Sequence, residues 1–112
     1  MSDLSKKKCI PCQGNIPAFD EAKIRSYLRK VDGWKALKDG RHHDYIEKKF
    51  RFKNFVESEK FVGKIGKIAE REGHHPEISF GWGYVIVRIS THAIKGLADS
   101  DFILAAKIDQ IQ

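Results

Sequence analysis

Apolar residues recur with the period of an α-helix in three parts of the chain. The first helix is predicted from about Asp20, a suitable N-cap residue, to Lys30. The second is predicted to follow Asn54 and to end at Gly73, and the third to start at about Asp99. The apolar faces of the three helices are Ile24, Tyr27, Leu28 and Val31; Phe55, Val62, Ile65, Ile68 and Ala69; and Phe102, Leu104, Ala105, Ile108 and Ile111.

Between these helices apolar and polar residues alternate, which is the pattern of half-buried strands. The pair Asp39-Gly40 marks a turn in the first alternating region, and Gly83 marks one in the second, so each region is predicted to be a β-hairpin. Within the second hairpin, alternation favours a core position for Phe80 and Trp82. The predicted strands span residues 34–37, 43–52, 78–82 and 85–89.

The resulting order, α-β-β-α-β-β-α, predicts an α+β fold with a four-stranded antiparallel sheet and three helices packed on one face. A chain of 112 residues is long enough for one domain with a real core. We expect this domain to span residues 20–112. Residues 1–19 are expected to form an irregular leader, because prolines and glycine interrupt every period there.

Composition and charge exclude some classes of protein. The chain has 41% hydrophobic and 32% charged residues, which is typical of a globular domain. It has no apolar run of bilayer length, and no apolar stretch follows its first lysines, so we expect no signal peptide, a cytoplasmic protein and no membrane contact. The net charge of +6 is spread along the chain and interleaved with acidic residues, so direct nucleic-acid binding is not expected.

The only two cysteines, Cys9 and Cys12, form a C-x-x-C pair in the leader. No second pair of Cys or His residues follows at zinc-finger spacing, so a structural zinc site is not expected. The pair does not open a helix after a strand, as a thioredoxin-like redox motif does. A chance occurrence and a function are both open interpretations.

The candidate chemistry is concentrated around two adjacent histidines, His74 and His75, at the predicted end of the second helix. Both rings can line one pocket only if the chain bends there, and Gly73 and Pro76 favour such a bend. Glu70 lies about one helical turn earlier, close enough to hydrogen-bond an imidazole.

A third histidine, His92, follows the last predicted strand, and Asp101 lies in the first turn of the last helix. Imidazoles suit a dehydration, in which one group protonates a leaving hydroxyl while another removes a proton from a neighbouring atom. Other interpretations are open, because a His-His-Pro sequence is often a surface turn and Asp101 could simply cap its helix. A second pair, His42-His43, is interpreted as an exposed hairpin end and is given no site role.

The spacing Glu70-x3-His74-His75-Pro76-x5-Trp82-x9-His92-x8-Asp101 resembles the pterin-4a-carbinolamine dehydratase family at every element. Further similarity includes Gly33-Trp34, Phe50-x-Phe52, Ser90-Thr91-His92 and Gly96-Leu97, so that the resemblance covers about residues 20–110.

This resemblance implies the fold predicted above and a hydro-lyase that removes water from 4a-hydroxytetrahydrobiopterin, giving quinonoid dihydropterin in tetrahydropterin recycling. No metal or organic cofactor is implied. His74, His75 and His92 would be catalytic, with His75 favoured as the acid, and Glu70 and Asp101 would orient imidazoles. The implied substrate-binding residues are Gly73, His74, His75, Pro76, Trp82, Ser90, Thr91 and His92.

One position has two open interpretations, and two positions differ from the residues that are usual in the family. Trp82 could be an aromatic wall for the flat pterin or a core residue. Gly73 stands where the family often has Asp or Asn, which removes a polar group from the pocket rim. Ala98 stands where Ser or Thr often caps the last helix, so we expect either that Asp99 caps it or that Asp101 is held less firmly.

Two other functions remain alternatives. One is a zinc-dependent hydrolase or zinc-binding module that uses the three histidines and Asp101, although adjacent histidines diverge too much to chelate one ion well. The other is a non-enzymatic interaction or dimerisation module, since animal members of the family also partner a homeodomain activator. The resemblance also implies a homodimer or homotetramer.

Overall fold

The computed structural model describes residues 3–9 and 16–112, and a four-stranded antiparallel sheet lies at its centre. The strands are β1 (Lys35–Lys38), β2 (Asp44–Arg51), β3 (Glu77–Gly81) and β4 (Tyr84–Ile89). Their order in the sheet is β1-β2-β4-β3, so the two hairpins meet along β2 and β4. Ile46 lies opposite Ile89 across this junction, which places apolar side chains from both hairpins on the same face.

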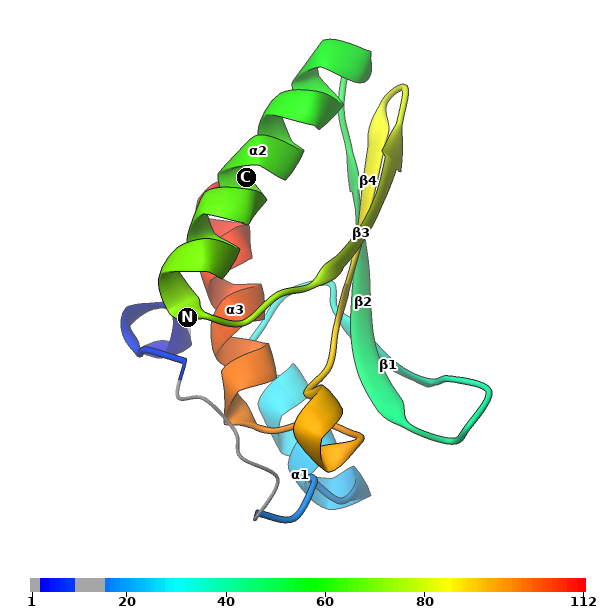
Figure 1. Ribbon diagram of the computed structural model, residues 1–112, viewed down its shortest axis with the longest axis vertical. Coiled ribbons are helices and arrows are strands. Elements are labelled where there is room, and N and C mark those ends of the chain that lie inside the picture. Colours follow the sequence, from blue (N-terminus) through cyan, green and yellow to red (C-terminus); the bar gives the residue numbers. More distant parts are fainter. Residues whose placement is uncertain (1–2, 10–15) are drawn as a thin grey trace.

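Three α-helices pack on that face of the sheet (Figure 1), and the predicted α+β fold is confirmed. They are α1 (Glu21–Leu28), α2 (Phe55–Glu72) and α3 (Asp99–Gln110). The side chains of Asp20 and Asn54 cap α1 and α2 by accepting backbone N–H groups, and Gly73 ends α2, as the sequence predicts. Two short 3-10 helices, η1 (Asp3–Lys6) and η2 (His92–Ile94), complete the described structure.

The core lies between the helices and the sheet. Phe50 and Val87 from the sheet, Ile65 from α2 and Phe102 from α3 are at most 2% exposed. Burial of each such side chain contributes roughly 1.5–3 kcal/mol through the hydrophobic effect. This layer therefore packs α2 and α3 against the sheet.

Phe80 and Trp82 lie outside this core, and the core interpretation of both residues is wrong. Phe80 is 39% exposed on the edge strand β3, where its ring packs against Phe55, with 5.6 Å between ring centroids. Trp82 is 72% exposed because β3 already ends at Gly81. The alternation of strand side chains therefore no longer governs the direction of Trp82.

Part of the predicted leader packs against the domain. Residues 3–6 form η1, and Leu4 and Cys9 are buried members of the hydrophobic core. Cys12 lies outside the described residues. Within the described part of the chain, no helix is both long and apolar enough to cross a bilayer.

Candidate active site

The C-terminal end of α2 positions the two adjacent histidines. Gly73 has φ 67° and ψ 25°, a left-handed conformation that glycine adopts without a Cβ penalty. The N–H of His74 donates to the carbonyl of Ala69 at 3.2 Å, so the backbone of His74 stays attached to the last helical turn. Gly73 therefore bends the chain just before both imidazoles, as predicted.

The two imidazoles contact different carboxylates. His74 Nε2 lies 2.7 Å from Oδ1 of Asp101, and only 16% of the His74 side chain is exposed. His75 Nε2 hydrogen-bonds Oε2 of Glu70, and both of these side chains are mostly exposed. The rings thus diverge, and each has its own acidic partner.

Asp101 is fully buried, and its carboxylate connects three segments of the chain. Besides His74, the hydroxyl of Thr91 and the backbone N–H of Ala98 each donate to Oδ2 at 2.8 Å. A buried carboxylate requires such donors, because burying it without them costs several kcal/mol. Asp101 therefore holds the bend after α2, the segment after β4 and the start of α3 together.

The same contacts correct the predicted cap of α3. Ala98 occupies the N-cap position and makes no side-chain cap bond, whereas Asp99 is the first residue of the helix. The expectation that Asp99 caps α3 is therefore wrong. The backbone N–H of Ala98 is satisfied instead by Asp101, which both caps the helix and binds His74.

His92 begins η2 directly after the buried Thr91, and its ring is exposed without a hydrogen-bond partner among residues 3–9 and 16–112. His92 and His75 both line a cavity of about 370 Å³, together with Pro76 and Ser90. Small-molecule pockets typically measure about 300–1,000 Å³. Two imidazoles from distant segments therefore face one cavity of suitable size for a small ligand.

The family model for pterin 4 alpha carbinolamine dehydratase matches residues 17–111. The chain belongs to the pterin-4a-carbinolamine dehydratase family. A protein of Rubrobacter xylanophilus is 40% identical over 111 residues, covering 99% of this chain and all of the relative. A protein of Azoarcus sp. is 44% identical over 111 residues, covering 99% of this chain and 92% of the relative. Both relatives carry the family name as a provisional assignment.

Solved structures with this fold include a transcriptional coactivator/pterin dehydratase from Brucella melitensis. It is 31% identical with a TM-score of 0.76, over 84% of this chain and 97% of that one. A pterin dehydratase-like RuBisCO assembly factor of the alpha-carboxysome is 21% identical with a TM-score of 0.60, over 70% of this chain and 88% of the other. This second similarity concerns the fold alone.

Four residues that the resemblance assigned to substrate binding do not line the cavity shared by His75 and His92. His74 is turned to Asp101, and Gly73 serves as the bend. Thr91 is buried against Asp101 and lines a neighbouring cavity of about 490 Å³. Trp82 lies beyond the opposite end of β3 and does not line this cavity, so a contact between Trp82 and the pterin stays a prediction.

Five other residues line the cavity shared by His75 and His92, and the sequence analysis did not identify them. They come from the β1–β2 loop, from β2 and from the ends of β3 and β4 that lie near the histidines. The register of the strands could have identified those in strands, for example through the pairing of Glu77 with Arg88. The missed residues are Asp39, Asp44, Tyr45, Glu77 and Arg88.

Charges of both signs surround the cavity. Asp39 accepts backbone hydrogen bonds from His43 and Arg41, and these bonds hold the pKa of its carboxyl below the usual value. Arg88 Nε donates to Oε2 of Glu47 at 2.8 Å. The rim therefore offers an ionised carboxylate and a guanidinium for orienting a polar ligand.

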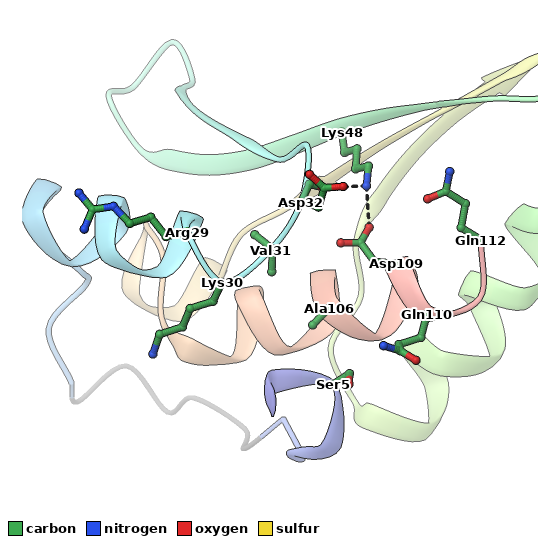
Figure 2. Close-up of a pocket in the computed structure, with 10 residues that line it drawn as sticks. All are labelled: Ser5, Arg29, Lys30, Val31, Asp32, Lys48, Ala106, Asp109, Gln110 and Gln112. Carbon is green, nitrogen blue, oxygen red and sulfur yellow. Dashed lines mark hydrogen bonds and ion pairs between the residues drawn. The ribbon is translucent and has the colours of Figure 1, made fainter. Parts of the chain in front are cut away.

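A larger cavity of about 680 Å³ lies between the C-terminal part of α3 and the segment after α1 (Figure 2). Its lining contains none of the predicted site residues. Lys48 donates to the carboxylate of Asp109 at 2.9 Å and to the backbone carbonyl of Asp32 at 2.7 Å. Trp34 Nε1 also donates to Asp109, at 3.1 Å. The charges of Lys48 and Asp109 thus satisfy each other and fasten α3 to the sheet.

The geometry also bears on the zinc alternative. Among residues 3–9 and 16–112, no three His, Cys, Asp or Glu side chains are grouped as a metal site would require. His74 and His75 instead direct their Nε2 atoms at separate carboxylates. A tetrahedral zinc site needs its ligands to converge on one point, and these two imidazoles do not converge.

The thiol of Cys9 is expected to be unreactive in the folded protein. Burial raises its pKa to about 11, and nearby Glu72 adds to the shift. Because the thiolate is the reactive form, alkylation of Cys9 by iodoacetamide at pH 8 should be about 100-fold or more slower than that of an unfolded thiol. Peptide mapping by mass spectrometry, with urea-unfolded protein as the control, measures this rate. Equal labelling in the two samples would contradict the raised pKa of this thiol.

Proposed function

We propose that the protein dehydrates 4a-hydroxytetrahydropterin to quinonoid dihydropterin and water, with His75 and His92 as general acid and general base. The observation that carries this proposal is the shared cavity, which His75 and His92 enter from different segments. Membership of the family supports the substrate class and the reaction.

In the proposed reaction the C4a–O bond breaks as the hydroxyl leaves. His75 donates a proton to this oxygen, which departs as water, while His92 removes the proton from N5. The N5–H electron pair forms the N5=C4a double bond of the quinonoid product. The reaction neither gains nor loses electrons or net protons, so no redox partner is required. Paired acid and base catalysis of this kind contributes about 10²–10⁴-fold to a rate.

The roles of the two imidazoles follow from their contacts. His75 Nε2 is occupied by Glu70, so Nδ1 is the nitrogen that remains for proton exchange with the substrate. The ring of His92 has no protein partner in the described part of the chain and is available as an acceptor. His74 would act behind the cavity, because its Nε2 is directed at Asp101. We propose that Ser90, Pro76 and the charged rim complete the binding surface.

A direct assay tests the proposal. Freshly prepared 4a-hydroxytetrahydropterin is mixed with the purified protein, and its conversion is followed by ultraviolet absorbance against the uncatalysed rate. We expect clear acceleration that survives treatment with a chelator. An unchanged rate would reject the enzymatic function and favour the interaction module. Loss of activity on chelation, restored by zinc, would favour the metal-dependent alternative.

Two further properties extend the proposal. We expect a homodimer or homotetramer, which light scattering after size-exclusion chromatography would detect. We also expect no DNA binding, even at low salt, where electrostatic binding is strongest.

A further inference from the structure

The N-terminal segment of residues 3–9 is built into the domain beside the active site. In Figure 1 this first turn lies against α3, close to the C-terminal end of α2. Leu4 is 4% exposed and Cys9 is 9% exposed, and both belong to the core. Lys107 of α3 donates from Nζ to the backbone carbonyl of Ser5 at 2.9 Å. The segment is therefore attached by both apolar burial and a charged hydrogen bond.

Cys9 contacts the end of α2 and the start of α3, next to His74 and Asp101. Its backbone N–H donates to Oε1 of Glu72 at 3.0 Å, although the two residues are 63 positions apart. Its thiol donates to the backbone carbonyl of Ser100 at 3.5 Å, across 91 positions. Cys9 therefore bridges the last residue of α2 and the first turn of α3.

The bridged ends lie directly beside the His74–Asp101 pair. Glu72 is separated from His74 only by Gly73, whose backbone N–H and that of His74 both bind the carbonyl of Ala69. Ser100 immediately precedes Asp101 in α3. A shift between the two helix ends would therefore change the 2.7 Å contact between His74 and Asp101 directly.

Glu72 is held in place by its charge. Its side chain is 7% exposed and lies 3.8 Å from Lys107 Nζ and 3.4 Å from Arg71 Nε. The hydrogen bond from the Cys9 N–H lowers the pKa of the Glu72 carboxyl, and the charge of Lys107 adds to this effect. The carboxylate is thus ionised at neutral pH and joins α2, α3 and the N-terminal segment.

We propose that Cys9 and Glu72 are positioning residues that hold the ends of α2 and α3 at the separation required for His74 to bind Asp101. Neither residue lines the cavity that His75 and His92 share. The effect on turnover rests on the proposed function, whereas the alignment of His74 can be measured without it. The N-terminal segment is then a structural part of the active site.

The test compares Glu72→Gln and Cys9→Ala with Glu59→Gln in the full chain. Glu59→Gln is a matched control, because it removes the same charge from an exposed position of α2. Proton NMR follows exchange of the His74 Nε2 proton, which the contact with Asp101 protects from water. We expect this exchange to be at least about tenfold faster in the Glu72 and Cys9 variants and unchanged in the control. We also expect kcat to fall about tenfold with KM nearly constant, since misplacing a supporting group affects mainly the reaction step.

Two results would overturn the proposal. The first is a lower unfolding temperature in the Glu72 and Cys9 variants with wild-type exchange of the His74 proton, which would indicate a purely structural role. The second is an equal change of exchange in Glu59→Gln, which would indicate a general effect of charge. If one of the two variants does not fold, the other still decides the outcome. If wild-type protein lacks dehydratase activity, the proposed function fails while the exchange measurement continues to test positioning.

Discussion

Replacing His92 with alanine is expected to lower the dehydration rate by about 10²–10⁴-fold, the usual contribution of one acid or base group. The same loss is expected for His75→Ala, because both rings line the cavity. Stability should change little, since His92 is exposed and the contact between His75 and Glu70 is also mostly exposed. The measurement combines the absorbance assay with urea unfolding of each variant.

The matched control for these substitutions is His42→Asn. His42 is an exposed histidine in the β1–β2 loop with a φ of 64°, a left-handed conformation that asparagine tolerates better than alanine. Its removal should leave the rate unchanged. Wild-type rates in both His75→Ala and His92→Ala would show that this cavity is not the catalytic site.

Asp101→Ala is expected to have the largest effect on stability, with a loss of about 3–5 kcal/mol in the free energy of unfolding. The substitution leaves Thr91, Ala98 and His74 without their shared acceptor inside the protein. Buried donors that lose their partner bear the full desolvation cost. Activity should also fall, because His74 is no longer fixed. Urea unfolding measures the loss, and assays at low denaturant and low temperature measure the remaining activity of the folded fraction.

Asp99→Ala provides the comparison for this prediction. Asp99 lies in the same helical turn but is exposed, so its charge contributes only about 0.3–1 kcal/mol through the helix dipole. A similar small loss for Asp101→Ala would mean that its hydrogen bonds do not stabilise the fold.

Helix boundaries were predictable because short-range interactions determine them. Asn54 caps α2 through the backbone N–H of Glu57 three residues later, and Gly73 ends the helix through its own backbone conformation. Both signals are complete within a few residues of sequence. The order of elements, and with it the α+β fold, followed from these local patterns.

Trp82 shows where local patterns fail. Its alternation with Phe80 predicted a common face, but the strand ends at Gly81, and the direction of a turn residue depends on turn geometry. Whether an apolar strand position is covered depends on where the opposing helix layer lies. The helix residue Phe55 that packs against Phe80 is itself 45% exposed, and the ring of Phe80 stays partly exposed.

Some residues of the candidate site could be predicted from local sequence, whereas others could not. Spacing and residue type identified His75 and His92, but not the loop and strand residues beside them, such as Asp39 and Tyr45. Tyr45 lies at the start of β2, where it pairs with Leu37 of β1, and Asp39 lies in the loop between these strands. A shift of one residue would turn Tyr45 to the other face of the sheet.

The sequence by itself determined the helices and the hairpins, because periodicity and caps are properties of neighbouring residues, and it determined the family and the histidines through a motif read along the chain. Only the tertiary structure decided that His74 turns to Asp101 while His75 and His92 share a cavity. It also decided that Cys9 packs between Glu72 and Ser100. These contacts join residues far apart in the chain, and they form only once packing of the core has brought the helix ends together.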